Sequence, residues 1–209
     1  EIADNAFNSN LEEVNFKDLD HIVFSGMGGS GALGDFFSSI LSKSEIHISI
    51  VKGYLLPKTV NKNSLVIITS VSGNTSETFQ VLKAAKKINC KIIVFSSGGQ
   101  IEKYCLQNKI LFRKILEFHS PRASFVSFLY SMLKILSPCI PVKKIDIEKS
   151  IKELYKTRRK IESKNITRNN PALNLALWIK GIPIIYYPWG LQAVAIRFKS
   201  SLQENAKIH

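Results

Sequence analysis

Runs of apolar residues recur along the first two thirds of the chain, and each is followed by polar residues that interrupt the run. Five of these runs have the length and β-branched content of buried strands; they cover residues 21–25, 46–51, 65–69, 91–95 and 111–116. The third run, LVIIT, is continuous and unbroken by polar residues, as expected for a strand that is covered on both faces.

The segments between these runs carry apolar residues at helical spacing. Residues 31–41 are one example, and a second amphipathic segment ends near residue 88. Ser120 and Pro121 mark the start of a helix over residues 122–136, because proline is well placed in a first helical turn. Strands that alternate with helices at this spacing predict an α/β fold, in which helices flank a parallel sheet and the crossovers are right-handed.

The alternation stops at Ser137-Pro138-Cys139-Ile140-Pro141, which we interpret as a domain boundary. The sequence then predicts a linker with a charged helix, followed by a restart of the α/β pattern with a single strand at residues 182–186. One strand cannot form a sheet, so we expect the second domain to be incomplete in this chain. The predicted division is a first domain at 1–137, a linker at 138–170 and the start of a second domain at 171–209.

Composition narrows the classes of protein that this chain can belong to. The 209 residues, 45% of them hydrophobic, are enough to bury a core without disulfides or a metal. No apolar run approaches the roughly 18–20 residues of a membrane span, so we expect no membrane partner. Three widely spaced cysteines without a CxxC pair predict reduced thiols in a cytoplasmic protein and no zinc site.

The net charge of +13 raises the question of a nucleic-acid partner. The basic residues are spread over separate segments, and no recognition helix, aromatic platform or zinc-finger spacing accompanies them. We therefore expect no nucleic-acid partner, and interpret the charge as solvated faces with a general attraction for anionic substrates.

The first predicted strand is followed by GMGGSG, residues 26–31, which satisfies the GxGxxG pattern. A dinucleotide-binding fold needs an acidic residue at the end of its second strand, and Lys52 stands there instead. Lys52 leaves an NADP-dependent reductase open as an alternative. Backbone amides at a helix entrance, with the Ser30 hydroxyl beside them, form an anion site. We therefore favour a phosphate or sugar phosphate over a dinucleotide, and over glycines that serve only a tight turn.

The third predicted strand runs into a second candidate phosphate site, SVSGNT at residues 70–75. Ser70, Ser72 and Thr75 offer three hydroxyls at a helix entrance, where amides point out of the sheet. The alternative is an ordinary helix cap, with the Thr75 side chain as the capping group. Two such loops on neighbouring strands favour a shared ligand, because ligands of open α/β sheets lie at the carboxyl ends of the strands.

The pairing of GMGGSG with SxSGNTxET resembles the sugar isomerase (SIS) domain. Three further segments narrow the resemblance: SSGG at 96–99, SPRA at 120–123 and RFKSSLQENAK at 197–207. Together and in this order they resemble the bifunctional phosphoglucose/phosphomannose isomerases of archaea and some bacteria, over nearly the whole chain.

This resemblance implies two SIS domains and a homodimer with active sites between its subunits. It implies isomerisation of glucose 6-phosphate or mannose 6-phosphate with fructose 6-phosphate, without metal or other cofactor. Arg122 would stabilise the enediolate, and Glu204 would move the proton between C1 and C2. The residues that would bind sugar and phosphate are Gly28, Gly29, Ser30, Ser70, Ser72 and Thr75.

One departure from the family pattern concerns a histidine. The family opens the sugar ring with a histidine that lies beyond the ENAK motif, whereas this chain ends at His209, five positions after Glu204. We consider His209 too close to Glu204 for that role and expect part of the catalytic set to be missing from the chain. The main alternative to an enzyme is therefore a non-catalytic SIS module that binds a sugar phosphate. No helix-turn-helix pattern supports a regulator of transcription.

Overall fold

The structure is a computed structural model that describes residues 1–208, except for the side chain of Pro121. The chain forms two compact units, Glu1–Pro141 and Val142–His209.

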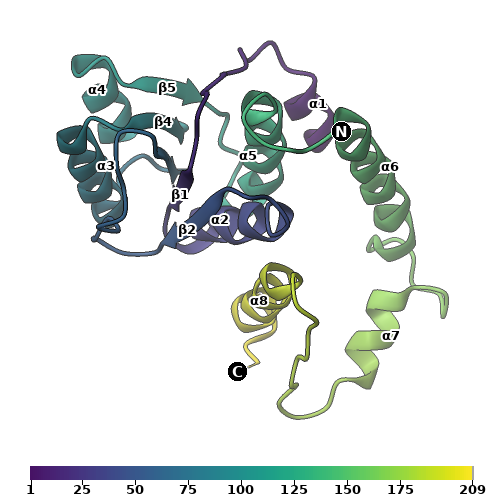
Figure 1. The fold of residues 1–209 in the computed structure, drawn as a ribbon. Coiled ribbons are helices and arrows are strands. Elements are labelled where there is room, and N and C mark those ends of the chain that lie inside the picture. The colour runs from purple at the N-terminus through teal and green to yellow at the C-terminus, as the bar shows by residue number, and fades with distance from the viewer. Residues whose placement is uncertain (209) are drawn as a thin grey trace. The chain divides into compact units, whose positions relative to one another are not determined.

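Unit 1 is built on a parallel five-stranded sheet with the strand order β2-β1-β3-β4-β5 (Figure 1). The strands are β1 (His21–Ser25), β2 (His47–Val51), β3 (Leu65–Ser70), β4 (Lys91–Ser96) and β5 (Leu111–Lys114). The parallel sheet predicted from the apolar runs is confirmed, and the predicted bounds are met to within two residues. The central strands β1 and β3 are buried at every position, whereas the edge strands β2 and β5 are half-buried or exposed at most positions.

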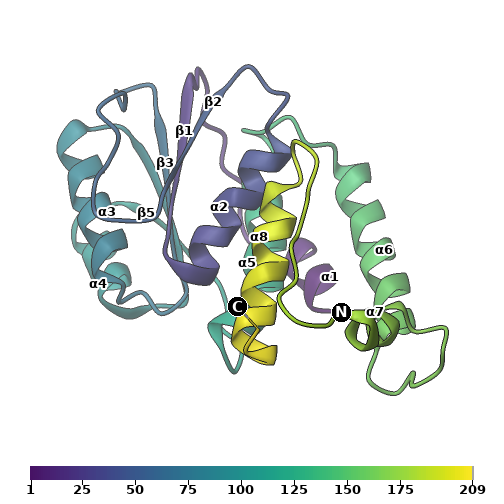
Figure 2. The ribbon, with the colours of Figure 1, turned by 90° about the horizontal axis from the view of Figure 1, so that it is seen from below.

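Helices cover both faces of this sheet (Figure 2). The helices of unit 1 are α1 (Ile2–Phe7), α2 (Gly28–Ile40), α3 (Ser76–Ile88), α4 (Gly99–Gln107) and α5 (Pro121–Leu136). Helices α3 and α4 lie on one face, and α2 and α5 lie on the other, with α1 against α5. The chain leaves β1 in one direction to reach β2 and leaves β3 in the opposite direction to reach β4. Right-handed crossovers therefore place α2 and α3 on opposite faces.

The cysteines of unit 1 are free thiols within this core. Cys105 and Cys139 are buried, and Cys90 is half-buried. Burial raises the pKa of Cys105 to about 11. The Cys139 thiol donates a hydrogen bond to the Val14 carbonyl at 3.1 Å, which joins the segment before β1 to the end of α5.

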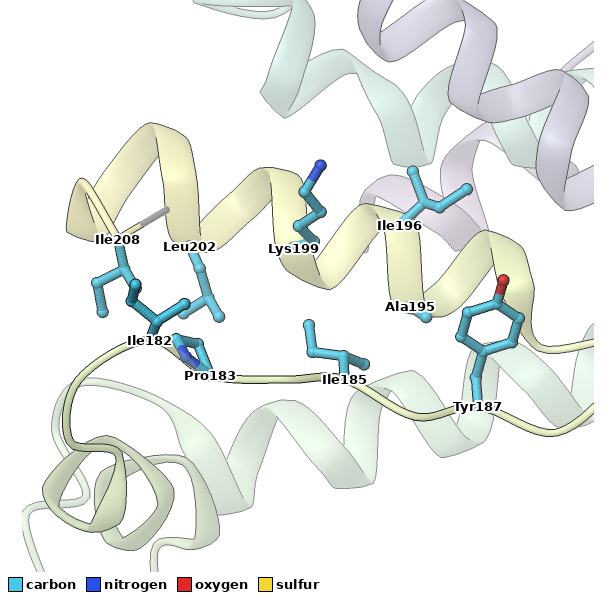
Figure 3. A pocket seen from close by; sticks show the side chains of 9 residues that line it. All are labelled: Ile182, Pro183, Ile185, Tyr187, Ala195, Ile196, Lys199, Leu202 and Ile208. Carbon is cyan, nitrogen blue, oxygen red and sulfur yellow. The ribbon is translucent and has the colours of Figure 1, made fainter.

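Unit 2 contains α6 (Lys144–Ile161), α7 (Pro171–Trp178), α8 (Gln192–Ser201) and the short π-helix η1 (Leu202–Ala206). Residues 182–186, predicted as a strand, form no ladder with any described residue, so that prediction is wrong for this chain. The physical reason is that a strand needs backbone hydrogen bonds with a neighbouring strand, and no described segment supplies them here. The segment is nevertheless extended beside α8, and Pro183, Ile185 and Tyr187 line an apolar pocket of about 270 Å³ against that helix (Figure 3).

The helices and the metal-ligating side chains of the described residues both bear on the class of protein. None of the helices at residues 1–208 combines the length and the apolar composition that a membrane crossing requires. Over the same residues, histidine, cysteine and acidic side chains nowhere gather in a group of three or more that could hold a metal ion.

Candidate functional site

The carboxyl ends of the five strands carry the candidate site. Three loops leave this rim: the glycine loop (residues 26–31) after β1, the hydroxyl loop (residues 70–75) after β3, and the SSGG loop (residues 96–99) after β4. Because the strand order reverses between β1 and β3, the glycine loop and the hydroxyl loop flank the switch point of the sheet. Open α/β sheets bind their ligands there.

The glycine loop packs closely at its first residue, where a side chain is excluded. A Cβ on Gly26 would lie 2.8 Å from the Ser30 carbonyl carbon and 2.9 Å from the Thr69 carbonyl oxygen. Gly28 opens α2 with φ +52°, and no side chain of the described chain caps this helix start. The Ser30 hydroxyl accepts a hydrogen bond from the Val71 amide at 3.3 Å and so joins the glycine loop to the hydroxyl loop.

The three hydroxyls predicted to hold a phosphate come together, but at different depths. Ser70 is buried; its Oγ lies 3.1 Å from Thr75 Oγ1 and accepts a bond from the Gly73 amide at 3.1 Å. Ser72 is exposed and Thr75 is half-buried. Ser72 and Thr75 are therefore the hydroxyls that a ligand on the rim can reach, while Ser70 supports Thr75 from below.

The structure overturns the alternative interpretation of Thr75 as a capping side chain. Thr75 is the N-cap residue of α3, but its side chain makes no capping hydrogen bond. Its hydroxyl lies beside Ser70 instead. The first-turn amides of α3 thus face the rim without a side-chain cap. Uncapped amides at a helix start, with the helix dipole behind them, favour an anion.

The hydroxyl loop and the SSGG loop interlock through their backbones. Gly73 has φ +67°, and a Cβ on it would lie 1.7 Å from the Gly98 carbonyl oxygen. The Ser97 hydroxyl donates to the Val71 carbonyl at 2.6 Å, and the Ile101 amide donates to the Gly73 carbonyl at 3.0 Å. The amides at the start of α4 are thus used within the protein. In α2 the Ser30 amide donates to the Met27 carbonyl at 3.0 Å, so the Gly28 and Gly29 amides and those at the start of α3 remain as candidates for a ligand.

The segment after β5 brings Arg122 and an unexpected carboxylate to the same rim. Glu117 Oε2 lies 3.2 Å from the Ser97 hydroxyl. Ser120 caps α5 by accepting a bond from the Ala123 amide at 3.2 Å, as its sequence context predicts. Arg122, in the first turn, is exposed. Glu117 is not among the residues predicted for the site; its one signal in the sequence is a carboxylate between a strand end and the SPRA segment.

Two lysines at the ends of the edge strands form ion pairs with carboxylates. Lys52 Nζ lies 2.6 Å from Asp35 Oδ2, and Lys114 Nζ lies 3.2 Å from Glu102 Oε1. The end of β2 thus carries a lysine bound by an aspartate of α2 and no carboxylate of its own. This arrangement differs from the acidic strand end that holds a ribose in dinucleotide-binding folds.

Glu204, the predicted base, belongs to unit 2, whereas Arg122 belongs to unit 1. Glu204 is exposed and lies in η1, where the helix predicted for residues 191–204 widens into a π-turn. Lys207 donates to the Glu204 backbone carbonyl at 2.7 Å and closes this turn. Such turns within helices are frequent at functional sites. His209 lies outside the described residues.

Comparison with known proteins gives matches along both units. A model of the SIS domain matches residues 15–132, more than half of the chain. A model described as the bacterial phospho-glucose isomerase C-terminal SIS domain matches residues 168–209.

Curated relatives cover most of the chain. It is 31% identical over 203 residues to the bifunctional phosphoglucose/phosphomannose isomerase of Caldicellulosiruptor bescii. The aligned region covers 93% of this chain and 59% of that protein. It is 26% identical over 195 residues to the D-glucosamine-6-phosphate 4-epimerase of Sulfolobus acidocaldarius, covering 91% of this chain and 59% of that protein. The resemblance to the bifunctional isomerases is confirmed, and the chain spans about 59% of the length of these relatives.

A solved structure shares the fold. The C-terminal domain of glucosamine-fructose-6-phosphate aminotransferase from Francisella tularensis superposes with a TM-score of 0.65 at 18% identity, and the match covers 100% of this chain and 64% of that one.

Proposed function

The chain belongs to the SIS domain family, and on that premise we propose that it acts on hexose 6-phosphates. The proposed reaction interconverts glucose 6-phosphate or mannose 6-phosphate with fructose 6-phosphate by proton transfer through an enediolate. The observation that carries the proposal is the rim of unit 1, where uncapped amides of α2 and α3 meet reachable hydroxyls.

The phosphate has a matching set of donors on this rim. A phosphate monoester has three terminal oxygens and about two negative charges at neutral pH. Ser72 and Thr75 supply hydroxyls, and the amides at the starts of α2 and α3 add backbone donors with favourable dipoles. Gly28 and Gly29 leave room for the sugar, because a Cβ at either would meet nothing within 4 Å.

The chemical step needs a base next to the carbonyl carbon and a fixed positive charge where the oxyanion develops. We assign the base to Glu204 and the positive charge to Arg122. Arg122 follows the Ser120 cap of α5, whose preceding segment is held to the rim by the contact between Ser97 and Glu117. The proposed mechanism works with these side chains and uses no cofactor.

The proposal includes a second SIS-like domain and a homodimer. The division 1–137, 138–170 and 171–209 stays a prediction, in which the last segment is the start of the second domain. The exposed apolar residues of unit 2 support it, because Ile184 is 76% exposed and Trp178 is 78% exposed. Side chains of this kind are usually covered in a finished assembly. The reduced cysteines support a cytoplasmic location.

The test compares three variants of the protein in steady-state kinetics. Glu204→Gln keeps the size of the side chain but cannot accept a proton at neutral pH, so kcat should fall by about 10²–10⁴ while KM changes little. Ser72→Ala should act mainly on KM, because a phosphate contact is equally strong in the ground and transition states. Glu117→Gln is the matched control carboxylate and should keep most of its turnover.

Three results would contradict this assignment. Near-normal exchange of the substrate C2 proton in Glu204→Gln would remove Glu204 as the base, and a collapse of kcat in Glu117→Gln would transfer that role. Binding of glucose 6-phosphate without turnover by the wild-type protein would favour the non-catalytic sugar-phosphate module. Product analysis by NMR separates C1–C2 isomerisation from the C4 epimerisation that the name of the Sulfolobus relative states.

A further inference from the structure

A cavity of about 530 Å³ lies within unit 1, lined by α1, α5 and the segment that follows β5. Ile2 and Ala6 line it from α1, and Ile115 and Leu116 line it from the end of β5. Leu11 and Phe118 extend this apolar part of the wall, whereas Asn5, Ser9 and Asn10 add polar residues to the lining. The volume falls within the range of roughly 300–1,000 Å³ that is usual for small-molecule sites.

Two serines contribute further polar groups to the lining, from α5. Ser127 and Ser131 line the cavity, although their exposed fractions are only 6% and 3%. They are four residues apart in a helix, so their side chains lie on the same face, one turn from each other. The cavity therefore has a polar pair at one wall.

These two hydroxyls differ from those of Ser124, in the same helix, and Ser137, its C-cap residue. Ser124 donates to the Ser120 carbonyl at 2.9 Å, and Ser137 donates to the Lys134 carbonyl at 3.0 Å, as serines in helices commonly do. Neither Ser127 nor Ser131 has a hydrogen-bond partner for its hydroxyl within residues 1–208. Both residues are almost wholly buried, but their hydroxyl oxygens are not sealed off from the cavity, so an occupant of the cavity can supply the missing partner.

The charges at this cavity indicate an uncharged occupant. Two charged residues belong to the lining: Lys114, whose ammonium is bound by the Glu102 carboxylate of α4 at 3.2 and 3.4 Å, and the acidic residue Glu1. A sugar phosphate, with two negative charges and hydroxyls on all sides, matches neither this charge balance nor the apolar walls. The cavity is thus chemically distinct from the rim around residues 70–75.

We propose that this cavity binds an uncharged amphipathic small molecule. Its apolar body fills the space between α1 and the end of β5, and its hydroxyl or amide group forms hydrogen bonds with Ser127 and Ser131. The site stands independently of the proposed isomerase activity. Helix α5, which contributes Ser127 to this site, also carries Arg122, five residues before Ser127.

The test uses benzyl alcohol and toluene as matched probes, which share the ring and differ in the hydroxyl group. With isoleucine methyl groups labelled for NMR, both probes should shift the Ile2 and Ile115 signals saturably at millimolar concentrations. In the double variant Ser127→Ala/Ser131→Ala, the affinity for benzyl alcohol should fall by about 5–10-fold through lost hydrogen bonds. Toluene should bind that variant within about twofold of wild type, which also shows that the variant is folded.

Two further variants complete the design. Ser137→Ala, at the C-cap of the same helix and away from the cavity lining, should leave the affinity for both probes unchanged. Ser131→Leu should fill the cavity and abolish the binding of both.

Four outcomes would overturn the proposal. The first is that neither probe shifts the Ile2 and Ile115 signals, and the second is that the double alanine variant binds benzyl alcohol as tightly as wild type. The third is a crystal structure of the benzyl alcohol-soaked protein in which the cavity holds only water or a polypeptide segment. The fourth is displacement of benzyl alcohol by glucose 6-phosphate, which would make the cavity part of the substrate site.

Discussion

Strand β3 of unit 1 and residues 182–187 of unit 2 are similar in sequence and differ in structure. LVIITS and IPIIYY are both rich in β-branched and apolar residues. β3 is buried at all six positions and is paired on both sides, with β1 and with β4. In the second segment Ile184 is 76% exposed and Tyr186 is 89% exposed, and no described strand pairs with it. Strand propensity therefore sets the extended backbone, and neighbouring strands decide whether it becomes part of a core.

The same contrast separates the proposed roles of the two units. Unit 1 carries a complete sheet and, at its rim, the loops that we propose bind the substrate. Unit 2 carries Glu204, the proposed proton carrier, next to a segment that lacks strand partners. The proposed binding and the proposed proton transfer would thus depend on two parts of the chain, of which only unit 1 has a fully packed sheet.

The largest expected effect comes from truncating one isoleucine in each segment. Ile67→Ala, in a fully buried position of β3, should lower the free energy of unfolding by about 2–5 kcal/mol. Ile184→Ala should change it by no more than about 0.5 kcal/mol, because the side chain is already exposed to water. Urea unfolding of both variants measures the difference. An equal loss in the two variants would mean that Ile184 is covered in solution, and the contrast between the two segments would disappear.

A smaller effect is expected from one glycine in each unit. Gly73 and Gly190 both have positive φ, +67° and +87°. The left-handed backbone costs alanine roughly 1–2 kcal/mol at either position. At Gly73 the new Cβ also meets the Gly98 carbonyl, whereas at Gly190 it meets nothing within 4 Å. Gly73→Ala should therefore lose roughly 1–3 kcal/mol more than Gly190→Ala, through hydrogen bonds broken as the loops separate. Equal losses in thermal unfolding would refute the interlock of the two loops.

A pH dependence of stability is expected from His21 in unit 1. Burial and the neighbouring His47 lower the pKa of His21, against the opposing effects of Asp20 and the Thr59 backbone. Its Nε2 lies 2.8 Å from Ser49 Oγ. Because the unfolded chain takes up this proton more readily, stability is complete above about pH 6.5 and falls as the pH drops from there through the folded pKa. Urea midpoints between pH 5 and 7.5 should show this slope in wild type and a flatter one in His21→Gln.

The smallest expected effect is that of Glu153 in unit 2. A hydrogen bond and ion pair with Lys156, at 2.6 Å, lower the pKa of this carboxyl group. The pair stabilises above the unfolded pKa and loses its contribution as the pH falls through the folded value. Water screens so exposed a pair, and Glu153→Gln should leave the urea midpoint within experimental error between pH 3 and 6. A marked shift would mean that α6 is covered in solution.

Much of unit 1 could be predicted from local pattern because its elements are locally encoded. The β-branched run of β3 and the Ser120-Pro121 start of α5 both carry their structure in a few consecutive residues. Helix α1 was not predicted, because its six residues are too few to show a helical period of apolar positions. The failed strand at residues 182–186 shows the opposite limit, since its pairing depends on neighbours that no local pattern contains.

The candidate site was predictable in its loops and not in its hydrogen bonds. Gly26 and Gly73 mark tight turns at strand ends, and such turns are visible in a sequence. The partners of the Thr75 hydroxyl depend on how deeply Ser70 is buried, which is a property of the folded sheet. The place of Glu117 depends likewise on the approach of two loops that are separate in sequence.

The interlock of the hydroxyl loop and the SSGG loop constrains how this protein can change by mutation. A Cβ on Gly73 meets the Gly98 carbonyl, and a Cβ on Gly99 meets the Ser72 carbonyl at 2.6 Å. Either substitution forces the same two loops apart. Once one substitution has separated the loops, a Cβ at the other glycine no longer clashes with the opposite backbone. The two positions are therefore epistatic: the cost of both changes together is smaller than the sum of the separate costs. A lineage that had lost one of these glycines would therefore meet a smaller cost in losing the other, namely the left-handed backbone at that position.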